Sequence, residues 1–189
     1  NQSRHYPVLY MLDGQNLFDA CLSDVSHHEW GMDETVYRLV AEKKVPPLIV
    51  VGVDHAGKDR AHEYLPYRDF VGNPDMDEPA GKRFPDFLAQ EVMPLVDGKY
   101  RTLPGQPNTG IGGSSYGGVA TLYALLAQPG RFGYGLIGRW WQTTQDPFFA
   151  ITSDPPEVWG PYVEHLKGWL KGEAPRMPGG GSEDLVEAL

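Results

Sequence analysis

The sequence predicts an α/β fold with a mostly parallel sheet flanked by helices, and three observations carry this prediction. Two short apolar runs, residues 6–12 and 47–53, have the composition of strands, and a helical pattern lies between them. This order makes a βαβ unit, in which the two strands run parallel. Residues 109–127 then combine an apolar strand, a glycine-rich turn and a helix-forming run. We expect one domain over residues 1–189.

The composition is that of an ordinary globular protein, and the charge argues against nucleic-acid binding. The 189 residues are 41% hydrophobic, which is enough to build a substantial core. The formal net charge of −9 argues against a protein that neutralises phosphates. No apolar run approaches the roughly 18 residues that span a bilayer. We expect a cytoplasmic protein without a membrane span, and the start at Asn1 leaves export open.

The first third of the chain is expected to form the βαβ unit. The run over residues 6–12 stops at Asp13-Gly14, which is a turn signal. The run over residues 47–53 is apolar and rich in β-branched residues, as is typical of a parallel strand covered on both faces. The helix between them opens at Asp33. Its apolar face carries Val36, Leu39 and Val40.

The middle of the chain predicts a long connection and then a helix. Residues 55–83 are too many for a simple loop, so they should carry short structure of their own or border a site. Residues 84–95 keep helical spacing, and Pro94 should bend the later part.

A serine motif lies between the third predicted strand and its helix. Residues 109–119 read TGIGGSSYGGV, with Gly113, Ser115 and Gly117 in a Gly-x-Ser-x-Gly pattern. Such a turn needs glycines because the strand and helix approach too closely for a Cβ. It would expose Ser115 as a nucleophile and aim the backbone N–H of Tyr116 at an acyl oxyanion. A plain glycine-rich loop is the alternative.

The remainder of the chain differs in character. Pro129-Gly130 should end the helix, and residues 132–137 read as another strand. Residues 139–154 are rich in aromatic and turn residues, and Pro156 could begin a further helix with one apolar stripe.

Four stretches occur in an order that is more specific than the serine motif alone. They read YPVLYMLDGQNLFD from residue 6, PPLIVVGVDHAGKDRAHEYLPY from residue 46, VMPLVDGKYRTLPG from residue 92 and IGGSSYGGVATLYALLAQPGRFG from residue 111. Over residues 6–138 the chain resembles the α/β-hydrolase serine esterases of the esterase D and enterochelin-esterase type. The resemblance implies an α/β-hydrolase fold, shortened at its C-terminal end. It also implies a serine carboxylesterase that hydrolyses small esters without a cofactor.

The resemblance also implies roles for matched residues. It makes Ser115 the nucleophile and Tyr116 one oxyanion donor, with the backbone N–H of Gln15 as the second donor. A simple surface turn at residues 13–16 is the alternative. Three further residues match a stretch near the active-site mouth: Arg60, Glu63 and Tyr64. For these the alternative to substrate contact is an exposed ion pair with a packed ring.

The catalytic base and acid are less clearly marked. A serine hydroxyl needs a base that a carboxylate orients, and α/β hydrolases have the order serine, acid, histidine. His165 is the one histidine after Ser115, although a packed helical histidine is the alternative. Asp154 is the first choice of acid, ahead of Asp146 and Glu157. Upstream histidines that could reach the mouth are His55, at the carboxyl edge of the predicted sheet, His27, His28 and His62.

Residues 139–189 contain no recognisable sequence motif of this family. Either the chain is truncated or altered after about Gly138, or the region has rebuilt the triad with His165. Two other functions also stay open, a non-catalytic domain for binding or assembly and an acyltransferase of the same fold. An aromatic group could line an acyl pocket, or equally form a core patch or a subunit contact: Trp140, Trp141, Phe148 and Phe149.

Two further expectations concern metals and self-association. Four potential ligands lie close together in the sequence, but their spacing matches no zinc motif, so no metal site is expected. They are His55, Asp59, His62 and Glu63. A shortened sheet would leave an exposed edge strand, which predicts a homo-oligomer.

Overall fold

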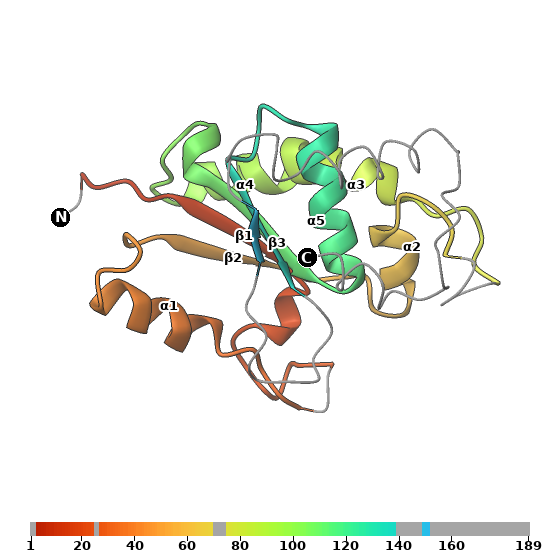
Figure 1. Cartoon of the computed structure of the whole chain (residues 1–189), viewed down its shortest axis with the longest axis horizontal. Coiled ribbons are helices and arrows are strands. Elements are labelled where there is room, and N and C mark those ends of the chain that lie inside the picture. Colours follow the sequence, from red (N-terminus) through yellow and green to blue (C-terminus); the bar gives the residue numbers. More distant parts are fainter. Residues whose placement is uncertain (1–2, 25–26, 70–74, 139–148, 152–189) are drawn as a thin grey trace. The chain divides into compact units, whose positions relative to one another are not determined.

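The computed structural model describes residues 3–24, 27–69, 75–138 and 149–151. The chain divides into two compact units, residues 1–152 and 153–189, and the description below concerns the first. Its five-stranded sheet has the order β2-β1-β3-β4-β5 (Figure 1). The strands are β1 (Val8–Leu12), β2 (Ile49–Val53), β3 (Thr109–Ser114), β4 (Tyr134–Gly138) and β5 (Phe149–Ile151).

The sheet is mostly parallel, as predicted. β1 pairs in parallel with β2 and β3, and β3 pairs in parallel with β4. β5 alone runs antiparallel, alongside β4. The α/β class is therefore confirmed, and the carboxyl ends of four strands meet at one edge of the sheet.

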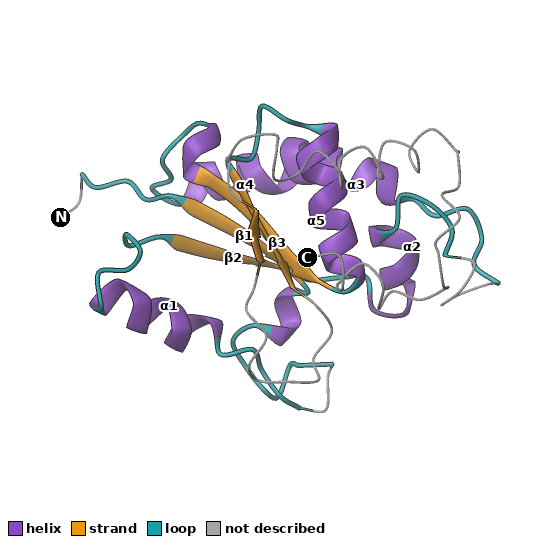
Figure 2. Cartoon of the chain, in the orientation of Figure 1, coloured by secondary structure: helices purple, strands orange, loops and turns teal. Residues whose placement is uncertain are grey.

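Helices cover both faces of the sheet (Figure 2). α1 lies on one face, while α3, α4 and α5 lie on the other. The helices are α1 (Met32–Ala41), α2 (Arg60–Tyr64), α3 (Phe84–Phe87), α4 (Met93–Lys99) and α5 (Tyr116–Ala127). Among the described residues, none of these helices has the length and apolar character needed to cross a bilayer.

β1 divides the core between the two faces, because successive side chains of a strand point in opposite directions. Its first, third and fifth residues pack in a cluster with Tyr64, Phe84 and Ile111. Its second and fourth residues, Leu9 and Met11, pack with Met32 on the side of α1. All five β1 residues are buried, so the central strand is fixed on both sides.

Two predictions for the middle of the chain are confirmed. Residues 55–83 carry short structure, namely 3-10 turns at Gly57–Asp59 and Gly81–Arg83 and the single turn of α2. Residues 84–95 are helical, through α3, a π-helical turn over Leu88–Val92 and the start of α4. α4 runs on past Pro94 to Lys99, and the bend expected at Pro94 stays a prediction.

The burial predicted for the second strand is wrong in part. In β2 only Val53 is buried, and the four preceding residues are partly or fully exposed. β2 is the end strand of the sheet in the described part of the chain. Although its composition is apolar, neighbouring elements therefore leave part of the strand exposed.

Candidate active site

The order of the strands reverses between β1 and β3. From β1 the chain crosses to β2 on one side, and from β3 it crosses to β4 on the other side. At such a reversal the loops that follow two neighbouring strands diverge, and in open α/β sheets ligands bind there. The two loops begin at Asp13 and at Ser115.

Ser115 occupies a sharp turn between β3 and α5. Its φ of 55° and ψ of −124° lie in a region that residues other than glycine rarely adopt. A Cβ on Gly113 would stand 2.5 Å from the carbonyl oxygen of Gly117. The predicted backbone clash is therefore confirmed at Gly113, whereas a Cβ on Gly117 would meet side chains, the nearest being Asp13 at 3.0 Å. α5 begins at Tyr116, and the first N–H groups of a helix have no partner within the helix.

The loop after β1 is buried and tightly packed. Asp13 has a left-handed backbone with φ 59°, and it is 1% exposed. A Cβ on Gly14 would come within 2.7 Å of the β2 backbone at Gly52. Asn16 is 3% exposed, and its side-chain oxygen accepts hydrogen bonds from Ser23 and Asp24. The alternative of a simple surface turn is therefore wrong.

Arg60 of α2 forms an ion pair with Asp13. The guanidinium donates from Nε to Oδ1 at 2.6 Å and from Nη2 to Oδ2 at 2.9 Å. Nη2 also donates to the backbone carbonyl of Ser114 at 3.2 Å. Burial disfavours the charged guanidinium, but the hydrogen bond and negative charge of Asp13 outweigh it and raise the pKa of Arg60. The ion pair of Arg60 is thus formed with Asp13 and is largely buried, in place of the exposed pair that was the alternative to substrate contact.

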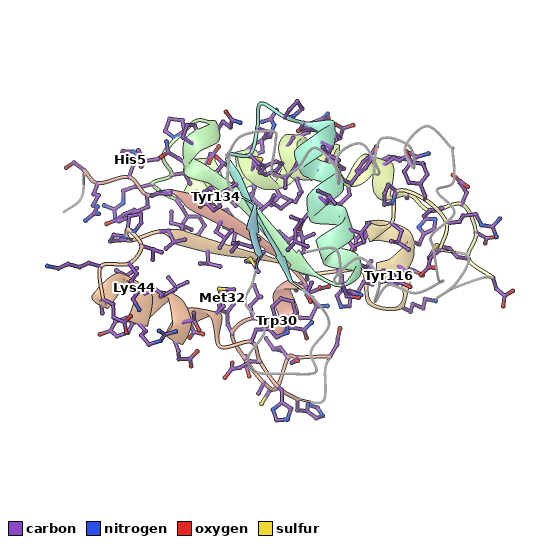
Figure 3. All side chains as sticks on the ribbon, in the orientation of Figure 1. His5, Trp30, Met32, Lys44, Tyr116 and Tyr134 are labelled. Carbon is purple, nitrogen blue, oxygen red and sulfur yellow. The ribbon has the colours of Figure 1, made fainter. Side chains whose placement is uncertain are left out.

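Two tyrosines flank this guanidinium. Its central carbon lies 5.4 Å from the ring centre of Tyr64 and 5.6 Å from that of Tyr116. The hydroxyl of Tyr64 accepts the backbone N–H of Asp13 at 3.0 Å. Burial, together with the charge of Asp13, raises the pKa of Tyr64, so this hydroxyl is neutral. Tyr116 stands at the end of α5 that faces α2 (Figure 3).

The Tyr116 hydroxyl has a partner of its own. It donates to Oδ2 of Asp69 at 2.8 Å. Burial and this hydrogen bond raise the pKa of Tyr116 to about 12. The side chain is thereby fixed at its tip while its ring packs on the guanidinium of Arg60.

His55 forms a second hydrogen-bond network with residues that follow β1 and β2. Its Nε2 lies 3.0 Å from Oδ2 of Asp24, and its Nδ1 accepts the N–H of Gly57. Because Nδ1 accepts, the proton is on Nε2 and points to Asp24. Gln15 joins the same network through both atoms of its amide group. Both ring nitrogens of His55 are therefore occupied.

The structure gives Glu63 a local partner. Its Oε2 accepts the backbone N–H of Ala56 at 2.9 Å. This bond closes the segment between β2 and α2. Among the described residues no group of three or more His, Cys, Asp or Glu side chains could hold a metal ion.

Several predicted site residues lie outside the described part of the chain. They are the candidate base His165, the candidate acids Asp146, Asp154 and Glu157, and the aromatic residues Trp140, Trp141 and Phe148. The predicted helix after Pro156 lies there as well. The assignments of His165 and Asp154 stay predictions.

Two acidic residues of the site had no assigned role in the sequence. The sequence pattern marks Asp13 only as part of a turn, and it gives no signal at Asp69. Asp13 directly follows a buried strand at the carboxyl edge of the sheet, which is a usable signal. No pattern links Asp69 to Tyr116, because the two are 47 positions apart and meet only in the fold.

Comparisons with known proteins give the same architecture and a family. The family model described as "Putative esterase" matches residues 1–167. The uncharacterized protein YbbA of Bacillus subtilis (strain 168) is 22% identical over 162 residues. The match covers 80% of this chain and 57% of YbbA, so the chain spans little more than half of that relative.

Solved structures with this fold include two longer proteins. The enterobactin esterase FES from Shigella flexneri, crystallised in the presence of enterobactin, is 26% identical, with a TM-score of 0.51. The match covers 77% of this chain and 33% of FES. The BES protein from Bacillus cereus is 22% identical, with a TM-score of 0.52, and the match covers 72% of this chain and 51% of BES. The likeness to BES shows the fold alone.

Proposed function

The chain belongs to the family described as "Putative esterase", and from this premise we propose that it is a serine carboxylesterase acting through an acyl-Ser115 intermediate. The observation that carries the proposal is the backbone of Ser115. Its positive φ is an unfavourable conformation that persists only where the surrounding structure imposes it. A strand-to-helix turn of this kind presents a nucleophile oxygen above the sheet edge.

The oxyanion hole is proposed to consist of two backbone N–H groups. Tyr116 is the first residue of α5, so its N–H is outside the hydrogen-bond ladder of the helix. Gln15 lies in the 3-10 turn Gly14–Asn16, whose hydrogen bonds use the N–H groups of Asn16 and Leu17. The N–H of Gln15 is outside those bonds. Two such donors would stabilise the negative oxygen of a tetrahedral intermediate.

His165 and Asp154 are proposed as base and acid. The support is their order along the chain: serine, then acid, then histidine, which is the order in α/β hydrolases. His55 is a weaker candidate because Asp24 and Gly57 engage both of its ring nitrogens. The base would take the Ser115 proton during attack and return it to the leaving alcohol.

The proposed substrate class is a small carboxylic ester. Family membership supports an ester, and FES, which is 26% identical to this chain where the two match, is named an esterase. The remaining candidate contacts, Trp140 and Trp141, are proposed to line the acyl side. The reaction transfers the acyl group to Ser115, releases the alcohol, and then transfers the acyl group to water.

The test is turnover of p-nitrophenyl acetate and butyrate by the parent chain and by Ser115→Ala. We expect turnover in the parent and a loss on the order of 10³-fold or more in the variant. Ser3→Ala is the matched control, because Ser3 is exposed and precedes β1 at the opposite edge of the sheet. A parent at background level, or a Ser115→Ala variant as active as the parent, would exclude the proposed mechanism.

A further inference from the structure

Arg60 contacts the loop after β1 and the turn after β3, and both contacts reach outside its own helix. We propose that Arg60 is a positioning residue that clamps the loop after β1 to the turn that carries Ser115. The clamp would set the separation of the Gln15 and Tyr116 N–H groups, and in this it rests on the proposed function. Arg60 would act through these neighbours without touching the substrate.

On the β1 side, α2 fixes Asp13 at two points. The Arg60 guanidinium binds both carboxylate oxygens, at 2.6 and 2.9 Å. The hydroxyl of Tyr64, four residues further along the same helix, accepts the backbone N–H of Asp13. Asp13 in turn accepts the N–H of Asn16 and so closes the turn that holds Gln15. The orientation of that turn therefore depends on α2.

On the other side, Arg60 contacts the residues directly before and after Ser115. Its Nη2 donates to the carbonyl oxygen of Ser114 at 3.2 Å. Its guanidinium also packs against the ring of Tyr116, with 5.6 Å between the central carbon and the ring centre. One side chain thus bridges the two loops from which both proposed oxyanion donors come.

The charge of Arg60 has a second consequence at this place. A Cβ on Gly117 would lie 3.0 Å from Oδ2 of Asp13, so the carboxylate approaches the first turn of α5 closely. A negative charge is favourable at a helix N-terminus, but it would oppose the negative oxygen that forms beside Ser115. The guanidinium neutralises Asp13 and leaves the N-terminus of α5 available to that oxygen.

Lysine cannot replace arginine in this arrangement. Its ammonium is a single point on a flexible stem, whereas the guanidinium is a planar fork that binds two oxygens and stacks on a ring. Arg60→Lys keeps the charge and removes the bridge. Arg38→Lys is the matched control, because Arg38 forms an exposed ion pair with Glu42 on α1.

The experiment measures kcat, KM and amide hydrogen exchange for the parent, Arg60→Lys and Arg38→Lys, at a temperature well below every Tm. For Arg60→Lys we expect kcat to fall by about 10- to 100-fold, because small displacements of reacting groups have effects of that order. KM should stay within about threefold, since the weakened interaction, between the two N–H donors and the negative oxygen, is made only in the transition state. Exchange should rise about tenfold or more at residues 13–17 and 114–117 and stay unchanged in β2.

Arg38→Lys should match the parent in all three measurements. The clamp is overturned if Arg60→Lys keeps the parent's kcat and local exchange. It is also overturned if exchange rises throughout the sheet, since the residue would then support the fold in general. If the parent shows no turnover, the proposed esterase fails, and the exchange data alone decide whether the clamp exists.

Discussion

The carbonyl oxygen of Gly117 lies 2.5 Å from the position that a Cβ on Gly113 would occupy. The first turn of α5 therefore rests directly on the backbone of β3. We predict that Gly113→Ala destabilises the fold by roughly 1–3 kcal/mol or more, because neither backbone can move away without breaking the elbow. Gly98→Ala is the control, since a Cβ there meets nothing within 4 Å and lies in α4. It should stabilise the protein by roughly 0.5–1 kcal/mol. Thermal unfolding of both variants measures whether the two changes in stability have opposite signs. Equal changes would contradict the close approach of α5 to β3.

The buried ion pair predicts an unequal cost of removing two acidic side chains. Asp13→Asn leaves the Arg60 guanidinium without its carboxylate in a site where Asp13 is 1% exposed. We expect a loss of about 3 kcal/mol in the free energy of unfolding. Glu42→Gln removes the partner of Arg38 and Lys44, which is an exposed cluster, and should cost less than about 1 kcal/mol. Denaturant titration compares the two variants, and a smaller loss for Asp13→Asn than for Glu42→Gln would count against a structural role for the pair.

Tyr116 gives a prediction at high pH. Its pKa is raised from 10.0 to about 12 by burial and by the bond to Asp69. The folded state therefore holds this proton more tightly than the unfolded state. The resulting stability is complete below pH 10 and is lost as the pH rises from 10 to about 12.

The measurement is a phenolate absorbance titration of the parent and of Tyr116→Phe. The parent should show a component near pH 12 that is missing in the variant. A parent in which Tyr116 titrates like a free tyrosine would show that the hydrogen bond to Asp69 is absent in solution.

The proposed base predicts the effect of one histidine. His165→Ala should lower kcat by roughly 10³- to 10⁶-fold if His165 activates Ser115. His5→Ala is the control, because His5 precedes the amino end of β1, away from the carboxyl edge (Figure 3). The measurement is kcat for p-nitrophenyl butyrate in the parent, His165→Ala and His5→Ala. If His165→Ala keeps the parent's kcat, the base lies elsewhere.

Local patterns were sufficient to predict four of the five described strands and the turn at Ser115, but not the antiparallel strand β5. The strand at β1 could be predicted because five buried residues in succession leave a continuous apolar run. The turn at Ser115 could be predicted because the close approach of the strand and helix backbones requires glycine at position 113. Both signals are contained within a few neighbouring residues.

The internal support of the site could not be predicted in the same way. Arg60 and Asp13 are 47 positions apart, and their pairing depends on where α2 docks against the sheet. His55 and Asp24 are also distant in the sequence, and their contact makes His55 a weaker candidate for the base. The partial exposure of β2 was missed because an apolar strand at the end of a sheet has the same composition as a central one.

The central claim is that Ser115 forms a covalent acyl intermediate. The most direct measurement is mass spectrometry of the protein after brief incubation with p-nitrophenyl acetate and an acid quench. We predict a mass increase of one acetyl group in the parent, located on the peptide that contains Ser115, and no increase in Ser115→Ala. An acetyl group on another residue of the parent, or one that persists in Ser115→Ala, would contradict the account.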